Sequence, residues 1–133
     1  MALRFWKRLV YFIPSILWML VIFYFSSRST TGIGGNNETD RFLILKSFHV
    51  IEYSALAILL FFGYRKYKFT IITAYIYALS DEYHQSFVPG RTSRFRDTLI
   101  DLGGICLSLF ILNILIKNNK FLEKLFNRLP KKI

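Results

Sequence analysis

The sequence is poor in the residues and motifs from which many active sites are built. It contains a single cysteine, Cys106, so no disulfide can form within the chain. It has no G-x-S-x-G sequence, no phosphate-binding P-loop and no Cys–His arrangement. No pattern indicates haem or flavin. We therefore assign no cofactor from the sequence.

Acidic residues are also scarce. Eight Asp and Glu stand against eighteen Lys and Arg, a formal net charge of +10, while 53% of the residues are hydrophobic. A chain this basic and this apolar is either a membrane protein with basic flanks or a nucleic-acid binder with a large core. The cations form short clusters between long apolar runs and do not follow one face of an amphipathic element, as a nucleic-acid footprint requires. We expect a membrane protein that binds no nucleic acid.

Long apolar runs are what the sequence has in abundance. Four runs of 17 to 19 residues are each long enough, as helices, to cross most of a hydrocarbon core. The sequence therefore predicts an all-α fold, an integral membrane four-helix bundle in one domain spanning residues 1–133. The expected helices cover about residues 9–25, 48–64, 69–87 and 98–116.

The connections between the runs have different characters. Residues 26–46 are polar and rich in Gly, Thr and Asn, which predicts a loop with little regular structure. Residues 88–91, Val-Pro-Gly-Arg, predict a type II turn with Gly90 at the position that needs a positive φ. Residues 117–133 are basic and amphipathic, and we expect them to lie along the membrane surface.

The fourth run combines small residues with one acid. Asp101 is its only charge, and Gly103, Gly104 and Ser108 predict a small face for close helix packing. Cys106 lies in the same run, where we expect it to be a small buried hydrophobe.

Orientation follows from the distribution of Lys and Arg, which favour the cytoplasmic side of a membrane. With the N-terminus inside, twelve cations are cytoplasmic and seven of the eight acids lie on or near the outer side. This predicts that both termini are cytoplasmic. Six cations are then extracytoplasmic: Arg28, Arg41, Lys46, Arg91, Arg94 and Arg96.

Ionisable residues gather where three of these helices meet the outer interface. His49 and Glu52 open the second helix, residues 81–85 close the third, and Asp97 and Asp101 open the fourth. A charge in a membrane helix costs about 2.5–3.5 kcal/mol, so these groups should face one another or a wet cavity. Spacings of three or four residues predict pairs that share a helix face, namely His49 with Glu52, Asp81 with His84, Glu82 with Gln85, and Asp97 with Asp101.

Three interpretations of this cluster stay open. It can be a structural charge network in which each acid pairs with a loop cation. It can be a binding or catalytic pocket for an anionic, membrane-bound substrate. Arg guanidinium groups bind phosphate or carboxylate through paired hydrogen bonds, and carboxylates near His can act as general acids or bases. It can also be a metal site, but no spacing matches a defined motif such as H-E-x-x-H, so the sequence assigns no metal ligands.

Three blocks of residues carry a resemblance to a known family. Lys46-x-x-His49-x-x-Glu52-Tyr53-x-x-Leu56 is followed by Asp81-Glu82-x-x-Gln85-x-Phe87-x-Pro89-Gly90-Arg91 and by Asp97-x-x-x-Asp101-x-x-Gly104. Together they resemble the VanZ-like family of small bacterial membrane proteins, over about residues 9–116. The second and third blocks are specific, whereas the first alone is weak. The family often has Asn where this chain has Asp101.

The resemblance implies where the protein is located but does not identify a reaction that it catalyses. The founding member is linked to low-level resistance to teicoplanin, so we expect a multi-pass protein of the bacterial plasma membrane. The candidate catalytic residues are His49, Glu52, Asp81 and Glu82. The candidate substrate-binding residues are Lys46, Tyr53, His84, Gln85, Arg91, Arg94, Arg96, Asp97 and Asp101.

The expected partners are membrane lipids and an anionic envelope ligand, either a lipid-linked cell-wall precursor or a lipoglycopeptide. Two alternatives belong to other classes. One is a membrane-embedded hydrolase or transferase that acts on a phosphate-bearing lipid. The other is a structural or partner protein of the membrane.

Overall fold

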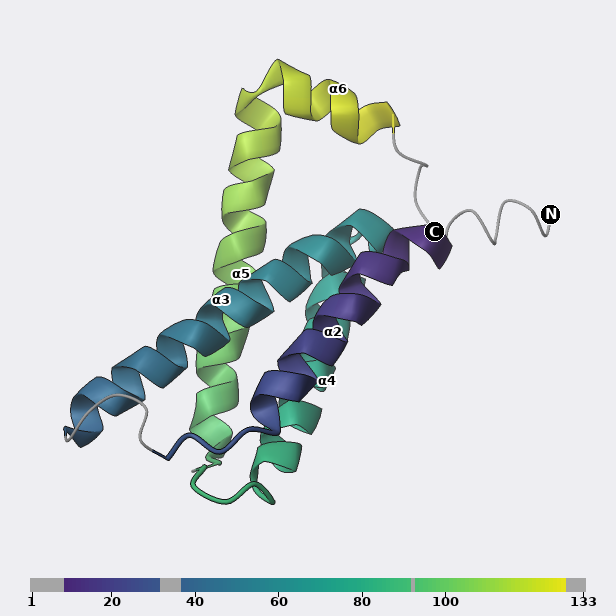
Figure 1. The fold of residues 1–133 in the computed structure, drawn as a ribbon. Helices are drawn as coiled ribbons and strands as arrows, with labels where there is room; N and C mark the ends of the chain where they lie inside the picture. The colour runs from purple at the N-terminus through teal and green to yellow at the C-terminus, as the bar shows by residue number, and fades with distance from the viewer. Residues whose placement is uncertain (1–8, 32–36, 92, 129–133) are drawn as a thin grey trace.

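A computed structural model of the chain describes residues 9–31, 37–91 and 93–128. In these residues the fold is all-α and contains no strand. A short 3-10 helix, η1 (Val10–Phe12), leads into α2 (Ile13–Ser26). It is followed by α3 (Glu38–Tyr64), α4 (Tyr67–Gln85), α5 (Phe95–Asn118) and α6 (Lys120–Arg128) (Figure 1).

The second expected helix starts ten residues earlier than the apolar run indicates. α3 begins at Glu38, so the predicted loop over residues 26–46 is wrong in its second half. The side chain of Asn37 accepts a hydrogen bond from the Thr39 N–H at 3.1 Å, which caps one of the unpaired donors of the first turn. Asp40 adds a negative charge near the positive end of the helix.

The turns at the two ends of α4 differ. Between α3 and α4, Arg65 adopts a left-handed conformation with φ 57°, and its N–H donates to Phe61 O at 2.9 Å. After α4, Gly90 has φ 79° and the Arg91 N–H donates to Val88 O at 3.2 Å, which confirms the type II turn. A Cβ at Gly90 would lie 2.7 Å from Thr31 Cγ2, so this turn also packs against the segment after α2.

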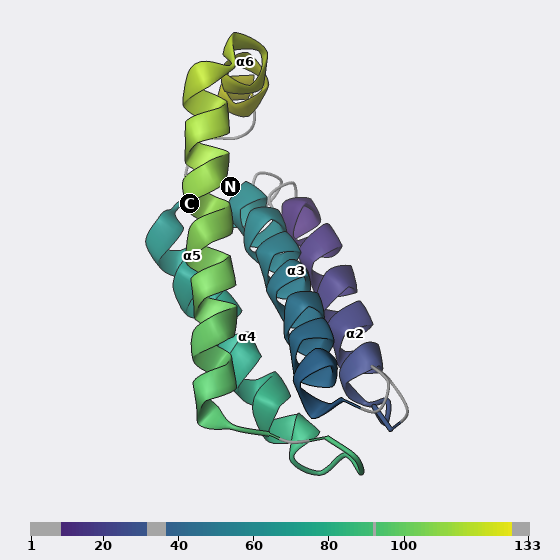
Figure 2. The same ribbon diagram turned by 90° about the vertical axis from the view of Figure 1, so that its left-hand side faces the viewer.

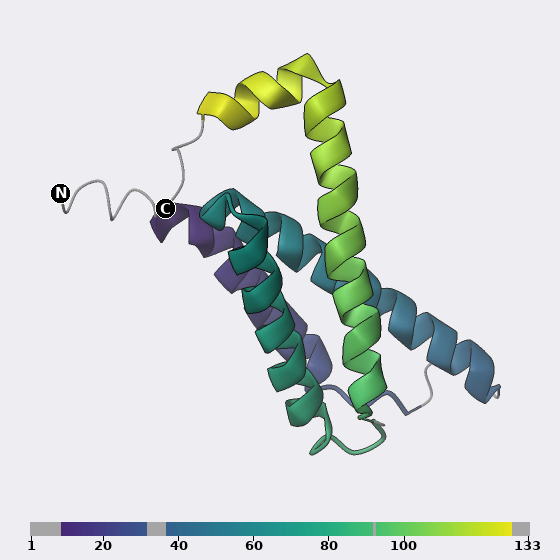
Figure 3. The ribbon, with the colours of Figure 1, turned by 180° about the vertical axis from the view of Figure 1, so that it is seen from behind.

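Successive long helices run in opposite directions. The C-terminal ends of α2 and α4 and the N-terminal ends of α3 and α5 lie at one end of the molecule, at the bottom of Figures 1 and 2. The α3–α4 turn and α6 lie toward the other end, and α3 extends past its neighbours at its N-terminus (Figure 3). The segment after α2 and the α4–α5 loop are therefore brought to the same end.

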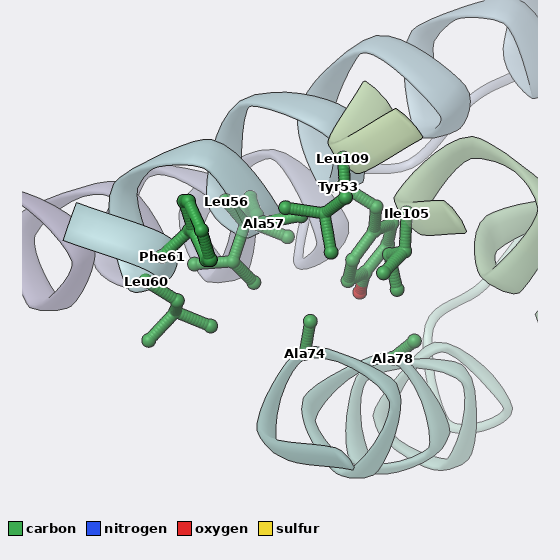
Figure 4. Packing of buried hydrophobic residues seen from close by; sticks show 10 residues of the cluster. Tyr53, Leu56, Ala57, Leu60, Phe61, Ala74, Ala78, Ile105 and Leu109 are labelled. Carbon is green, nitrogen blue, oxygen red and sulfur yellow. The ribbon is translucent and has the colours of Figure 1, made fainter. Parts of the chain in front are cut away.

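The core lies between α3, α4 and α5, with a contribution from α2. Small residues on α4, among them Ala74 and Ala78, let it approach the other helices closely (Figure 4). Two hydrogen bonds fix α2 against this core: Trp18 Nε1 donates to Glu52 O at 2.9 Å, and Tyr77 Oη donates to Met19 O. The buried cluster consists of Ile22, Tyr53, Leu56, Ala57, Leu60, Phe61, Ala74, Ala78, Ile105 and Leu109.

The outer surface of the helices is largely apolar. Thr39–Tyr64 and Phe95–Asn118 are long and apolar enough to cross a membrane, and only 28% of the most apolar window of each is buried. Ile51, Ile76 and Phe110 are each at least 60% exposed. A soluble protein rarely exposes so much contiguous apolar surface, so these helices are compatible with a lipid environment. The apolar helix Val10–Ser26 is shorter.

The crossing of α3 and α5 depends on a glycine. A Cβ at Gly104 would lie 3.2 Å from Val50 Cγ1 and 3.3 Å from Val50 O, and Ser54 Oγ donates to Gly104 O at 3.2 Å. A Cβ at Gly103 would meet nothing within 4 Å, so the predicted small face includes Gly104 but not Gly103. Cys106 is exposed, which corrects the expectation that it is buried.

The amphipathic segment near the C-terminus forms the helix α6. Its Phe126 ring stacks on Phe61 with a centroid distance of 5.5 Å, and the Arg65 guanidinium lies 3.2 Å from the centroid of the same ring. Arg65 also donates a hydrogen bond to Phe126 O. These contacts fasten α6 to the α3–α4 turn, away from the end where the ionisable residues gather.

Candidate functional site

The polar residues of three helices meet at the end that carries the α4–α5 loop. α3 contributes residues of its middle, α4 those of its last turn and α5 those of its first two turns. The buried polar side chains gathered there are His49, Asp81, Glu82, Gln85, Asp97 and Asp101, each at most 6% exposed. So many buried ionisable groups need specific partners, which the structure supplies only in part.

The outermost pair joins α3 to α5. Lys46 Nζ lies 2.7 Å from Asp97 Oδ2, and the Asp97 side chain is 2% exposed. Arg96 approaches the other oxygen of Asp97 only to 3.9 Å and is itself 64% exposed. The short, buried ion pair with Lys46 is the one that contributes to stability, because exposed ion pairs near 4 Å contribute little to it.

Asp81 is at the centre of a second network, which joins α4 to α3 and α2. Its Oδ2 accepts hydrogen bonds from Tyr53 Oη at 3.0 Å and from Gln85 Nε2 at 2.7 Å. Gln85 Nε2 also donates to Ser26 Oγ at 3.3 Å. Gln85 therefore pairs with Asp81, four residues before it, while Glu82 is buried on the same side of α4. The second oxygen of Asp81 is buried, and none of the described residues forms a hydrogen bond with it.

Glu82 points toward the start of α5. Its Oε1 accepts the backbone N–H of Arg94 at 2.8 Å, and Ser93 Oγ donates to the Glu82 carbonyl at 2.8 Å. Both bonds fix the end of the α4–α5 loop on the last turn of α4. The remaining oxygen, Oε2, is buried and has no hydrogen-bond partner in the described part of the chain.

His49 lies between Glu82 and Asp101. His49 Nδ1 is 3.5 Å from Asp101 Oδ1, close enough for attraction if the ring is charged, yet in the part of the chain that the structure describes neither atom has a hydrogen-bond partner. His49, Glu82 and Asp101 each offer one potential ligand atom, and these atoms lie within 4.8 Å of one another. All three side chains are buried, and each comes from a different helix.

Two candidate residues lie apart from these contacts. His84 faces α2: its Nε2 is 3.0 Å from Ser27 Oγ and its ring packs on Phe23 with a centroid distance of 4.6 Å. His84 therefore contacts α2 and not the buried carboxylates. Glu52 is half-buried, and its carbonyl, rather than its carboxylate, makes the hydrogen bond to Trp18.

Within the described residues, Arg91 forms no salt bridge with a carboxylate and bonds to backbone carbonyls. Its Nε donates to Arg28 O at 3.1 Å and its Nη2 to Phe25 O at 2.8 Å. The guanidinium thus satisfies carbonyls at and just beyond the C-terminus of α2, where a cation also complements the helix dipole. Burial lowers the pKa of Arg91, and nearby carboxylates oppose the shift, so it stays a cation.

A cavity of about 470 Å³ lies beside this cluster. Its wall carries four Lys or Arg side chains against one carboxylate, and apolar residues of α3 complete it. His49 and Gln85 connect the cavity to the buried polar groups. The lining residues are Thr30, Arg41, Phe42, Leu45, Lys46, His49, Gln85, Gly90, Arg91, Arg94 and Asp97.

Arg41 and Thr30 are part of this cavity but were not candidates in the sequence. Arg41 Nη2 donates to Thr30 Oγ1 and to Gly90 O, both at 3.1 Å, and Thr30 Oγ1 donates to Gly90 O at 2.9 Å. These hydrogen bonds join the segment after α2 to the turn after α4. Both residues lie within residues 26–46, for which the composition predicts a loop with little regular structure. The signal that would have found Arg41 is the Asn37 cap, which places it on a helix.

Comparison with known proteins gives a family match. The sequence model of the family described as VanZ/LLP1 matches residues 11–116. The matched range contains every candidate site residue and the helices α3 and α4, with almost all of α5. No curated protein and no solved structure matches the chain.

Proposed function

The chain belongs to the VanZ/LLP1 family, and from this premise we propose that it is a four-span membrane protein that binds an anionic envelope ligand in its cationic cavity. The ligand is an envelope lipid or a lipoglycopeptide that carries a phosphate or carboxylate. The observation that carries the proposal is the cavity wall, where Arg41, Lys46, Arg91 and Arg94 surround a space bordered by apolar side chains.

Four spans are supported by the lengths and directions of the helices. α4 has 19 residues and η1 with α2 has 17, about 28 and 25 Å of helix, close to the thickness of a hydrocarbon core. Each of these helices lies antiparallel to its chain neighbours (Figure 1). If α3 and α5 cross the membrane, α4 must cross between them, because it connects the end of α3 to the start of α5.

The cation count supports a cavity that lies outside the cell. Twelve of the eighteen Lys and Arg are cytoplasmic when both termini are, and six are extracytoplasmic. The ligand would therefore be reached from the outer leaflet, where lipid-linked wall precursors and lipoglycopeptides are found. α6, with its basic and apolar faces, would lie on the cytoplasmic surface.

The cations that line the cavity have N–H donors that the described part of the chain does not use and that a ligand could accept. A guanidinium has five N–H donors and an ammonium has three. Arg41 and Arg91 each use part of their fork on backbone carbonyls, and Lys46 is paired with Asp97. The side chain of Arg94 has no hydrogen bond or ion pair to the rest of the described chain. Arg94 is therefore the cation best placed to bind a phosphate or carboxylate.

Phe42 and Leu45 give the same cavity an apolar side. A soluble anion gains nothing from such a wall, whereas a lipid or lipopeptide can place the first carbons of its chain there. On the neighbouring face of α3, a second hollow of about 320 Å³ is lined by Leu43, Ile44, Ser47, Phe48 and Ile51. The combination of cations and adjoining apolar surface favours an amphiphilic anion over a small ion.

Binding can be tested with the full chain in detergent and two short-chain lipids, dihexanoyl phosphatidic acid and dihexanoyl phosphatidylcholine. We expect the phosphatidic acid to raise the Tm and to bind measurably by calorimetry, and the phosphatidylcholine to do neither. Arg94→Gln should weaken the binding about tenfold, the equivalent of about 1.4 kcal/mol, because it removes a charge-assisted hydrogen bond.

Arg96→Gln is the matched control. Arg96 lies two residues further along the chain and carries the same charge, but it does not line the cavity and is 64% exposed. It should change the Kd by less than about twofold. Equal losses in both variants would show binding to a diffuse basic surface, and no binding of phosphatidic acid would reject the proposal.

The link to teicoplanin is tested with the same pair of variants. Expression of the wild-type chain in a teicoplanin-sensitive bacterium should raise the inhibitory concentration, and the Arg96→Gln chain should do the same. The Arg94→Gln chain, at equal abundance in the membrane, should give less protection. Equal protection by all three chains would show that the resistance does not depend on ligand binding in the cavity.

A second candidate function is suggested by His49. This imidazole lines the cavity, while its Nδ1 faces Asp101 from 3.5 Å. A histidine oriented by a carboxylate is a common general base, so hydrolysis or transfer on a phosphate-bearing lipid is the chemistry that this arrangement can support. Release of phosphate from phosphatidic acid, lost in His49→Gln and kept in Arg96→Gln, would favour the enzyme over the binding protein.

A further inference from the structure

His49, Glu82 and Asp101 make a buried group that the lipid-binding proposal does not use. They come from α3, α4 and α5, and they are 6%, 5% and 1% exposed. Within the described residues, each carries one buried atom without a hydrogen-bond partner: Nδ1 of His49, Oε2 of Glu82 and Oδ1 of Asp101. Each of the three residues also offers one potential ligand atom, and these atoms, from three different helices, lie within 4.8 Å of one another.

The charges of this group do not balance. Two carboxylates are buried beside one imidazole, and within the described residues no Lys or Arg forms a salt bridge with either carboxylate: Lys46 pairs with Asp97, and Arg91 bonds to backbone carbonyls. Burying an uncompensated carboxylate is strongly unfavourable. A divalent cation between the three side chains would neutralise both carboxylates and leave the imidazole neutral, which is the form that binds a metal.

We propose that His49, Glu82 and Asp101 bind one divalent transition-metal ion at the floor of the cavity. One nitrogen and two carboxylate oxygens suit Zn²⁺ or Mn²⁺. Ligand atoms around such an ion lie about 3–3.5 Å apart, because each is about 2.1 Å from the metal. The separation of 4.8 Å or less requires only a small inward rotation of the side chains.

Two further features fit a metal site. Glu82 Oε1 accepts the Arg94 N–H at 2.8 Å, so one oxygen is fixed by the protein while the other is left for the ion. His49 also lines the cavity, which gives the ion a path of entry and leaves room for a water or a ligand oxygen in its coordination sphere.

The test uses the full chain with any histidine tag removed. After treatment with a chelator, the purified protein is dialysed against Zn²⁺ or Mn²⁺, and the metal content is measured by mass spectrometry. We expect one ion per chain in the wild type. His49→Gln and Asp101→Asn should each lower the affinity at least about 100-fold, because loss of a supporting residue outside the ligand sphere already costs 10–100-fold.

His84→Gln is the matched control, because His84 is the only other histidine and its Nε2 is held near Ser27. It should keep one ion per chain. If the ligand variants do not accumulate, Co²⁺ absorption of the wild type decides: visible bands from a nitrogen and oxygen site support the proposal. Substoichiometric metal in the wild type, or equal binding in all variants, would show an adventitious ion only and overturn it.

This experiment is independent of the lipid. The metal is measured without phosphatidic acid, and Arg94→Gln should keep the ion while it loses the lipid. A chain that binds the metal but no lipid would retain this site and reject the proposed function. The reverse result would reject the metal site alone.

Discussion

Replacement of Tyr53 by phenylalanine removes a single atom from the polar network of α3 and α4. Tyr53 is fully buried, and its Oη donates to Asp81 Oδ2 at 3.0 Å. Phenylalanine keeps the ring and its packing, so the change isolates the hydrogen bond. Among the described contacts, Asp81 would then keep only the hydrogen bond from Gln85, since its other oxygen has no partner there.

Two general magnitudes bracket the expected effect. Hydrogen bonds to charged groups contribute about 1.5–3 kcal/mol in soluble proteins. Hydrogen bonds between membrane helices average about 0.6 kcal/mol and reach about 1.7 kcal/mol. The Tyr53–Asp81 bond joins two helices, but its acceptor is a carboxylate that is 4% exposed and short of donors. We therefore expect Tyr53→Phe to lower the free energy of unfolding by about 1–2 kcal/mol.

The assay is reversible unfolding in mixed micelles, with Tyr75→Phe as the matched control. Tyr75 Oη is 3.4 Å from Thr98 Oγ1, a long contact between neutral groups, so its loss should cost less than about 0.5 kcal/mol. A double-mutant cycle of Tyr53→Phe with Asp81→Asn should give a coupling energy of about 1 kcal/mol. Equal effects of the two Tyr→Phe changes, or a coupling of zero, would refute the reasoning.

Two further predictions concern packing and topology. Gly104→Ala should lower the free energy of unfolding by about 1–2 kcal/mol, because the new Cβ would lie 3.2–3.3 Å from atoms of α3. Gly103→Ala should raise the free energy of unfolding by about 0.5–1 kcal/mol, because its Cβ would meet nothing within 4 Å. Equal unfolding energies of the two variants would refute this account of the α3–α5 crossing. In a Cys106→Ser background, cysteine at exposed Thr39 should react with an impermeant maleimide on intact cells and cysteine at exposed Lys124 should not. The opposite pattern would place the cavity in the cytoplasm.

The sequence determined which parts of the chain are helical and where their polar ends lie. Apolar runs of 17–19 residues already indicated α2 to α5, and the turn after α4 followed from Pro89 and Gly90. The alternation of helix directions then brings the starts of α3 and α5 to the end of α4. Helix positions and turns can be predicted from local sequence, because hydrophobic length and turn chemistry depend on neighbouring residues only.

The start of α3 was missed although its signal is local. Composition indicated a loop over residues 26–46, since Gly, Thr and Asn dominate its first half. The cap at Asn37 starts a helix that the apolar run alone places at residue 48. Arg41 was lost with it, because a residue assigned to a loop has no predicted face and therefore no predicted neighbour.

Only the tertiary structure decided which polar groups meet. At 3.6 residues per turn, Asp81, Glu82 and Gln85 turn inward while His84 turns toward α2, and spacing alone cannot tell which arc of a helix faces the interior. Arg91 likewise bonds to carbonyls of Phe25 and Arg28, distant in sequence, rather than to a carboxylate. The convergence of His49, Glu82 and Asp101 depends on how three helices are rotated and crossed. Those rotations are set by the packing of small residues such as Gly104 and Ala78, and this packing involves pairs of residues that sequence periodicity does not relate to one another.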